Sequence, residues 1–248
     1  TQIAEYLDKM KADGKHTVNM VPGDGEHGAA GICYGASVGG GRVLNATSAN
    51  GLLYAMEQLP VQSGTRFPMV LNVVTRSVSG PLDIKCDHSD VMMALNTGWI
   101  ILMAKDAQAV YDMNILAVKI GEHKDIRLPV IVASDGFFVS HQVRKVDIFK
   151  DKKDVANFLG EYEAPYTAID PENPVTIGAY MNDPDLINNK VQLVEAMEKS
   201  GPIIDEIFKE YEELTGRKYE RIYKYKTDDA DIIVFLTGSV VPTMTEAA

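Results

Sequence analysis

Polar side chains that could perform chemistry follow the apolar, strand-like runs of this sequence. Ligands of an open parallel sheet bind at the carboxyl ends of its strands, so residues just past such runs are the first candidates for a site. A carboxyl group there could exchange a proton with a ligand, and a guanidinium could hold a carboxylate through paired hydrogen bonds. The candidates are Asp24, Gly25, Glu26, Thr47, Ser48, Asn50, Arg76, Ser77, Asp135 and Gly136.

Glu26 stands directly after the turn Pro22–Gly25, at the start of a helix-like segment rich in Ala and Gly. Small residues on that helix would let a ligand or another backbone approach closely. An alternative interpretation is an ordinary Glu in a first helical turn, where the helix dipole favours a negative charge. A phosphate site at the Gly-rich turn is disfavoured, because Asp24 and Glu26 would repel the phosphate.

Arg76 ends the apolar run Val70–Thr75 and is a candidate for binding the carboxylate of a substrate. An ordinary salt bridge at the sheet edge also fits this position, and a Lys would serve that purpose equally well. The cluster Asp87–Asp90 contains residue types found in metal sites, but helix capping with solvated charge is the interpretation that we favour. We therefore expect no metal site on this chain.

Hydrophobic periodicity predicts alternating strands and helices up to about residue 136. Apolar strands that are covered on both faces by helices are typical of a parallel sheet, so we expect a doubly wound, mostly parallel α/β domain. The expected helices cover residues 2–12, 26–38, 50–59, 89–96 and 107–120, and the expected strands cover 16–21, 42–46, 68–75, 99–104 and 129–133.

The remainder of the sequence has a different character. Residues 140–182 are charged and Pro-rich and predict an extended arm, whereas 186–215 predicts a long amphipathic helix and 231–237 an apolar strand. Both ends look cut, so we expect a piece of a longer polypeptide. The predicted division is a first domain lacking its N-terminal segment over 1–141, an arm, linker and long helix over 142–230, and the start of a truncated second α/β domain over 231–248.

Composition excludes several functions. The net charge of −11 argues against binding to nucleic acid or to an anionic membrane surface, both of which select for clustered Lys and Arg. Cys33 and Cys86 are too few for an iron–sulfur cluster, which needs about four thiolates. No apolar run spans a bilayer and no signal peptide is recognisable, so we expect a cytoplasmic protein. A dinucleotide site is disfavoured, because no G-x-G-x-x-G follows a strand.

Six motifs in order resemble the α subunit of pyruvate:ferredoxin oxidoreductase and its relatives. The later runs Gly216–Tyr219 and Asp228–Ser239 look like the same family's link to its next domain, so the resemblance covers almost the whole chain. The six motifs are Gly25–Gly31, Ala46–Leu52, Arg66–Arg76, Asp87–Asp90, Thr97–Trp99 and Asp135–His141.

The resemblance implies that residues 1–141 are a pyrimidine-binding domain for thiamine diphosphate. The family's catalytic Glu then falls on Glu26, which would hydrogen-bond the ring nitrogen N1′ of the aminopyrimidine. Arg76 matches the arginine that binds the substrate carboxylate, with Thr47 and Ser48 in the substrate loop. Gly25 and Asn50 would lie beside the cofactor.

The same resemblance implies partners. A β subunit or partner domain would hold the diphosphate and its magnesium ion, and an iron–sulfur subunit or domain would pass electrons to ferredoxin. The implied reaction is oxidative decarboxylation of a 2-oxoacid with coenzyme A to an acyl-CoA, CO₂ and reduced ferredoxin. Pyruvate is the favoured substrate. Because His27 and the run Ser79–Leu82 depart from common pyruvate enzymes, oxalate, phenylglyoxylate or another 2-oxoacid stays open, as does a non-catalytic scaffold subunit of the same fold.

Overall fold

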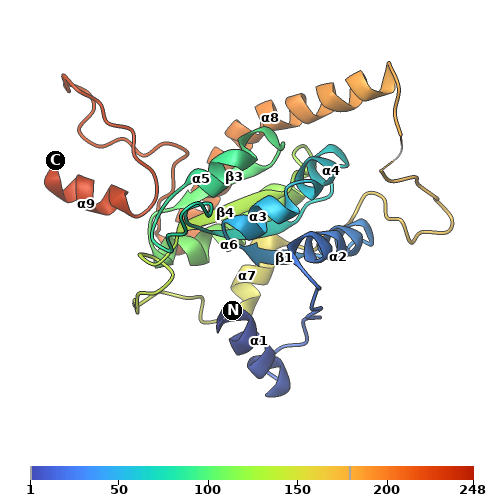
Figure 1. Ribbon diagram of the computed structural model, residues 1–248, viewed down its shortest axis with the longest axis horizontal. Coiled ribbons are helices and arrows are strands. Elements are labelled where there is room, and N and C mark those ends of the chain that lie inside the picture. Colours follow the sequence, from blue (N-terminus) through green and yellow to red (C-terminus); the bar gives the residue numbers. More distant parts are fainter. Residues whose placement is uncertain (1, 179) are drawn as a thin grey trace.

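The computed structural model describes residues 2–178 and 180–248 and contains a four-stranded parallel sheet (Figure 1). The strand order is β1-β2-β4-β3, and every neighbouring pair is parallel. All four carboxyl ends therefore lie at one edge of the sheet. The strands are β1 (Leu44–Thr47), β2 (Val70–Thr75), β3 (Ile100–Ala104) and β4 (Val130–Asp135).

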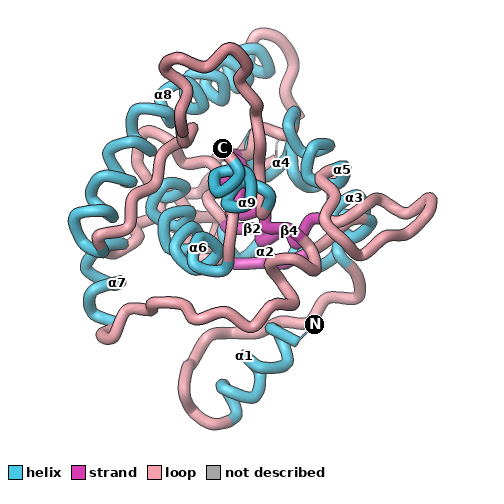
Figure 2. Tube along the Cα trace, turned by 90° about the vertical axis from the view of Figure 1, so that its left-hand side faces the viewer, coloured by secondary structure: helices cyan, strands magenta, loops and turns pink. Residues whose placement is uncertain are grey.

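Helices cover both faces of the sheet (Figure 2). Along β4, Val130 and Val132 pack on one face while Ile131 and Ala133 pack on the other, because successive side chains of a strand point to opposite sides. The first face is covered by α6 (Ala107–Glu122), α7 (Lys152–Leu159) and α8 (Asp185–Thr215). The second face is covered by α2 (Glu26–Val38), α3 (Asn50–Ala55), α4 (Gln58–Gly64) and α5 (Ser89–Met92).

The chain changes faces where it changes direction across the sheet. From β1 the chain passes through α3 and α4 to β2, and from β2 through α5 to β3 at the far edge, always on the second face. It then returns from β3 to β4 through α6 on the first face. Right-handed crossovers require this change of face, because a reversal of direction on the same face would be left-handed. The doubly wound α/β class predicted from the sequence is confirmed.

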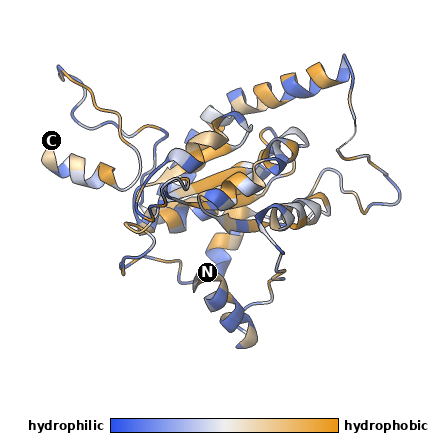
Figure 3. Cartoon of the chain, in the orientation of Figure 1, coloured by the Kyte–Doolittle hydropathy of each residue, from blue (hydrophilic) through white to orange (hydrophobic). Residues whose placement is uncertain are grey.

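Apolar strands form the centre of the molecule, and α8 shows alternating polar and apolar turns over them (Figure 3). Its buried side chains include Ile204, Ile207 and Phe208, which belong to the same apolar cluster as α6 and the first face of the sheet. Each such side chain contributes about 1.5–3 kcal/mol through burial. Among the described helices none is long and apolar enough to cross a bilayer.

Some predicted elements differ from the structure. No strand forms over 16–21 or 231–237, although both are β-branched runs, and Val18, Ile232 and Phe235 are largely exposed. A strand needs a neighbour to accept its hydrogen bonds, and the described residues supply none there. The predicted helix 50–59 divides into α3 and α4, and Pro60, which cannot donate a helical hydrogen bond, lies in the first turn of α4.

The C-terminal part contains two more helices. Within the predicted arm, α7 (Lys152–Leu159) forms behind its N-cap Asp151, whose side chain accepts the Lys153 N–H, and buries Phe158. The last helix is α9 (Val240–Ala247), and α1 (Gln2–Ala12) lies at the other end of the chain (Figure 1). The division of the sequence into domains at residues 141 and 230 stays a prediction.

Candidate functional site

Glu26 is the first residue of α2, as the sequence predicts. The extended Gly25 precedes it, and a Cβ atom at Gly25 would lie 3.0 Å from Cε1 of Tyr54. The turn is thus held close to α3. A side chain at Gly25 would separate the start of α2 from α3 and move Glu26.

The carboxylate of Glu26 lies against β1 and α3. A Cβ atom at Gly51 would lie 2.7 Å from Glu26 Oε1 and 2.6 Å from Thr47 Oγ1, which is too close for any side chain. Although Glu26 is exposed as a residue, its acid group therefore rests on the carboxyl end of β1. The structure brings together Glu26 and Thr47, two of the residues predicted to form the site.

A small cavity lies beneath Glu26, with a volume of about 40 Å³ and with Thr47, Cys33 and Trp99 among its lining residues. A cavity of this volume holds a few water molecules at most, since each needs roughly 10–15 Å³ of such space, and an aminopyrimidine ring does not fit inside it. A ring that contacts Glu26 must therefore lie at the open edge of the sheet, above the cavity.

Three buried side-chain polar atoms have no hydrogen-bond partner among the described residues, and one of them, Thr237 Oγ1, directly precedes Gly238 beside Asp135. The other two are Thr47 Oγ1, at the end of β1, and Arg76 Nη1, just past the end of β2. An unmade hydrogen bond of a buried group costs about 1–3 kcal/mol, so native proteins rarely leave such atoms unpaired without a reason. A hydroxyl and a guanidinium in this state fit a polar, anionic ligand.

Asp90 connects the ends of these two strands and was not predicted as a site residue. It is fully buried, and its Oδ2 accepts the Ala49 N–H at 2.8 Å and the Arg76 N–H at 3.2 Å. Burial raises the pKa of Asp90. Sequence reasoning had assigned the cluster Asp87–Asp90 to capping and solvated charge, because no local pattern shows that α5 brings Asp90 against two strand ends.

The remaining predicted residues occupy the rim of the site. The Asn50 amide oxygen accepts hydrogen bonds from the Ser79 N–H at 2.9 Å and the Ser79 hydroxyl at 2.8 Å, so it anchors the loop after β2. The Ser48 carbonyl accepts the Gly51 N–H at 2.9 Å in the first turn of α3. His27 turns toward the connection between α3 and α4, where its Nε2 lies 3.0 Å from Gln58 Nε2.

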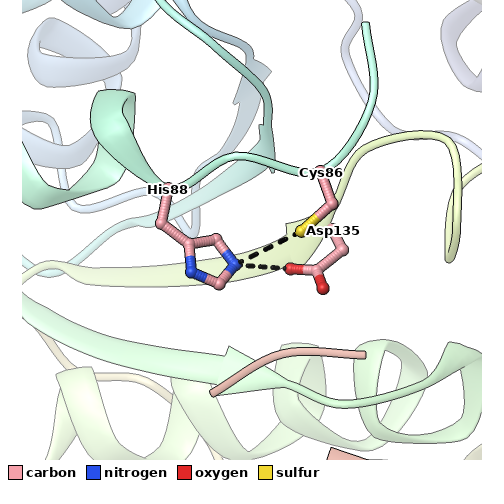
Figure 4. A group of neighbouring side chains, drawn as sticks. All are labelled: Cys86, His88 and Asp135. Atoms are coloured by element: carbon pink, nitrogen blue, oxygen red, sulfur yellow. Dashed lines mark hydrogen bonds and ion pairs between the residues drawn. The ribbon is translucent and has the colours of Figure 1, made fainter. Parts of the chain in front are cut away.

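Asp135 ends β4 and belongs to a second polar cluster with Cys86 and His88 (Figure 4). His88 Nε2 lies 2.8 Å from Asp135 Oδ1 and 3.8 Å from Cys86 Sγ, and the other Asp135 oxygen accepts the Ser239 N–H at 2.6 Å. The three donor atoms lie close enough for one metal ion. Because Asp135 also accepts the Ser239 N–H, this cluster of Cys86, His88 and Asp135, which we call the latch, holds Gly238 and Ser239 to the sheet edge.

The fold is an α/β domain with a parallel sheet, and the carboxyl edge of this sheet holds the Glu26 carboxylate and an Arg76 guanidinium nitrogen without a partner among the described residues. A profile of the family described as pyruvate flavodoxin/ferredoxin oxidoreductase, thiamine diphosphate-binding, matches residues 1–209. The chain belongs to this family, which confirms the resemblance noted in the sequence.

Curated relatives carry related activities in their names. A pyruvate synthase subunit PorA from Thermotoga maritima is 41% identical over 244 residues, covering 98% of this chain and 62% of that protein. PorA from Pyrococcus furiosus is 36% identical, covering 99% and 62%. A ketoisovalerate oxidoreductase subunit VorA from Pyrococcus abyssi is 33% identical, covering 100% and 62%. The chain therefore spans about 62% of the length of these relatives.

A solved structure shares the fold. The 2-oxoglutarate:ferredoxin oxidoreductase from Magnetococcus marinus, determined with 2-oxoglutarate, coenzyme A and succinyl-CoA bound, superposes with a TM-score of 0.60. The match covers 82% of this chain and 40% of that chain at 20% sequence identity. At this identity the likeness supports the architecture alone.

Proposed function

We propose that this chain is the α-subunit region of a thiamine diphosphate-dependent 2-oxoacid:ferredoxin oxidoreductase and that Glu26 is its catalytic carboxylate. The overall reaction is oxidative decarboxylation of a 2-oxoacid, pyruvate first, with coenzyme A to an acyl-CoA, CO₂ and reduced ferredoxin. The observation that carries the proposal is the placement of the Glu26 carboxylate on Gly51 and Thr47, at the end of β1.

In this proposal Glu26 acts on the aminopyrimidine ring of the cofactor. Bound thiamine diphosphate supplies the carbanion chemistry that removes CO₂ from a 2-oxoacid. Glu26 holds a proton at the aminopyrimidine nitrogen N1′, which a carboxyl group at the ring edge can share. Gly25 and Gly51 keep the approach to this carboxyl group open, because a side chain at either position would occupy space that Tyr54 or Glu26 now fills.

Arg76 and Thr47 bind the substrate in this proposal. The unpaired Arg76 Nη1 is available for a carboxylate oxygen, and the unpaired Thr47 Oγ1 for a second polar group of substrate or cofactor. Ser48 and Asn50 shape the rim, since Asn50 fixes the loop at Ser79. In this proposal both unpaired atoms gain hydrogen-bond partners when the ligand binds.

The open edge of the site implies a partner. Because a cavity of about 40 Å³ cannot enclose the cofactor, its other walls come from elsewhere, and a β subunit with the diphosphate-binding domain and magnesium fits this need. An iron–sulfur subunit then carries electrons to ferredoxin, since this chain has only two cysteines. We place the complex in the cytoplasm and expect no nucleic acid or membrane partner, in keeping with the net charge of −11.

Replacement of one carboxylate tests the proposal. In the complete complex, Glu26→Gln should lower turnover by about a hundredfold or more, on the scale of general acid–base catalysis. Glu213→Gln makes the same chemical change at an exposed position of α8 and should leave turnover unchanged. Near-normal turnover in Glu26→Gln would support a non-catalytic scaffold subunit instead.

The substrate is tested separately with a panel of 2-oxoacids and coenzyme A. Pyruvate should give the highest kcat/KM, because a pyruvate synthase subunit is 41% identical and a ketoisovalerate subunit 33%. Oxalate and phenylglyoxylate belong in the panel as alternatives. His27, which suggested oxalate, turns toward Glu57 and Gln58, so substitution of His27 should not change the order of substrates.

A further inference from the structure

We propose that Asp90 is a positioning residue that sets the loop beneath Glu26 and the backbone of Arg76 at the same time, without itself touching ligand. This inference rests on the proposed function, because it assigns to Asp90 the geometry that the catalytic and substrate-binding groups need. Three observations carry it: the burial of Asp90, the pattern of its hydrogen bonds and the backbone conformation of Ala49.

The first observation is a buried carboxylate whose oxygens, within residues 2–178 and 180–248, accept hydrogen bonds from backbone N–H groups alone. Asp90 is fully buried; Oδ2 accepts the N–H groups of Ala49 and Arg76, and Oδ1 accepts the Val91 N–H at 2.7 Å. An amide in place of the carboxylate would keep one acceptor oxygen and turn an NH₂ donor toward an N–H group. The site thus favours a carboxylate over its closest analogue.

The second observation is the backbone of Ala49, which Asp90 holds. Ala49 has φ 44 and ψ −118 and is completely buried. An L residue rarely adopts a positive φ, and such a conformation persists only where surrounding contacts fix it. Asp90 supplies that contact through the Ala49 N–H. Two residues later, Gly51 lies against the Glu26 carboxylate and Thr47 Oγ1, so the position of Ala49 determines the surface on which Glu26 rests.

The third observation is that the same oxygen binds the backbone of Arg76. Arg76 is the residue after β2, and its guanidinium nitrogen Nη1 is buried and lacks a partner within the described chain. The position of the Arg76 backbone determines the point from which the side chain extends, and so the region that its guanidinium can reach. Since Oδ2 of Asp90 is shared by Ala49 and Arg76, movement of one carboxylate would shift the catalytic and the substrate-binding groups together.

The test compares two buried aspartates in the complete complex. Asp90→Asn should lower kcat at least tenfold and raise the KM for the 2-oxoacid, in assembled complex assayed well below its melting temperature. Asp112→Asn makes the same change in α6, away from the site, and should lower the melting temperature while kcat and KM per folded complex stay near wild type. Unchanged kcat and KM in assembled Asp90→Asn would overturn the inference.

A second variant tests the role of the Ala49 backbone. Glycine adopts a positive φ without a supporting contact, so Ala49→Gly in the Asp90→Asn background should restore part of the lost kcat, and a purely structural Asp90 predicts no such rescue. If the Asp90→Asn complex does not assemble, the kcat of the double variant Asp90→Asn with Ala49→Gly is measured instead. A kcat well below that of wild type in this assembled double variant supports the positioning role, and a normal kcat overturns it. Failure of both variants to assemble counts against a positioning role. An active Glu26→Gln refutes the proposed function, whereas an inactive Glu26→Gln with normal Asp90→Asn refutes only this inference.

Discussion

Asp90 and Asp112 are buried on opposite faces of the sheet, and the surroundings of the two carboxylates differ. Asp112, on α6, accepts hydrogen bonds from Tyr211 at 2.7 Å, from Arg217 at 2.7 Å and from Tyr219 at 2.6 Å. Every one of these partners belongs to α8 or to the segment just after it. We call the Asp112 cluster closed, because its carboxylate is paired with the Arg217 guanidinium and both tyrosine hydroxyls donate to it.

Asp90, on α5, lies at the carboxyl edge beside polar atoms that are not paired. Thr47 Oγ1 and Arg76 Nη1 are buried near this edge without a partner in residues 2–178 and 180–248. A saturated cluster stabilises a fold, whereas an unsaturated one loses stability until a ligand completes it. The comparison indicates that the Asp112 cluster fastens α8 to the domain, whereas the unpaired atoms near Asp90 agree with the binding site that we propose at this edge.

The largest effect is expected at the closed cluster. Asp112→Ala leaves Arg217 without its ion pair and two tyrosines without their acceptor, and loss of one partner of a buried pair costs about 3–5 kcal/mol. Urea unfolding should show this loss, while kcat per folded complex stays unchanged. Asp205→Ala breaks an exposed ion pair between α8 and Arg221 and should hardly move the midpoint. Equal midpoints for the two variants would remove the distinction between the clusters.

The two tyrosines that donate to Asp112 remain protonated at the pH of an activity assay. Burial first, and then the Asp112 carboxylate, raises the pKa of Tyr211 and Tyr219 above the ordinary range. Both phenols therefore remain hydrogen-bond donors through neutral and mildly alkaline pH. The network stays closed over the whole range in which activity would be measured.

The next effect is expected at the open cluster, where Arg76→Met removes the unpaired guanidinium. Loss of a hydrogen bond to a charged group costs about 1.5–3 kcal/mol, so kcat/KM for the 2-oxoacid should fall about ten- to a hundredfold, with KM carrying most of the change. Stability should not fall in proportion, because the guanidinium nitrogen has no partner to lose. Arg144→Met, at an exposed position bonded only to Gln142, is the control. A large loss of stability in Arg76→Met with unchanged KM would reassign the residue to the fold.

A smaller effect tests the contact between the site and its floor. Gly51→Ala places a Cβ atom against Glu26 Oε1 and Thr47 Oγ1, so the carboxylate must shift and kcat should fall about tenfold, roughly 1.4 kcal/mol. Gly35→Ala lies in the same helix, α2, but outside the run Gly25–Gly31, and its Cβ meets no atom within 4 Å. This control should retain activity and gain slightly in stability, because Ala is the better helix former. A Gly51→Ala complex with normal kcat would show that Glu26 does not depend on this surface.

The sequence predicted the sheet because three of its four strands, β2, β3 and β4, are largely apolar runs of five or six residues, and it placed Glu26, Thr47 and Arg76 at the carboxyl edge by the rule for parallel sheets. The strands predicted at 16–21 and 231–237 were wrong, because the local pattern of a strand does not report whether a neighbour exists. The catalytic and binding roles of the residues at the edge stay predictions.

Asp90 escaped prediction for a different reason. Its function in the structure is to receive backbone N–H groups from positions 41 and 14 residues earlier in the chain, and no periodicity encodes that approach. The same holds for Asp112, whose partners Tyr211 and Arg217 lie about a hundred residues later. A buried polar contact between distant segments becomes visible only once the elements are assembled.

The smallest effect concerns the latch of Cys86, His88 and Asp135, which is closed like the Asp112 cluster but lies at the open edge. Burial first, and then the Asp135 carboxylate, raises the pKa of the Cys86 thiol to about 12. A thiol is charged only above its pKa, so in a Cys33→Ser background iodoacetamide should modify Cys86 at pH 8 at least tenfold more slowly than it modifies free cysteine, and the rate should rise with pH.

The same assay shows what closes the latch. Asp135→Asn removes the negative charge beside the thiol, so the Cys86 pKa should fall and alkylation should become faster. A rate for the unaltered latch equal to that of free cysteine would mean that the thiol is not held in its neutral form. A slow rate that does not depend on pH and rises on addition of EDTA would mean that a bound metal, and not the hydrogen bond between His88 and Asp135, holds the three side chains together.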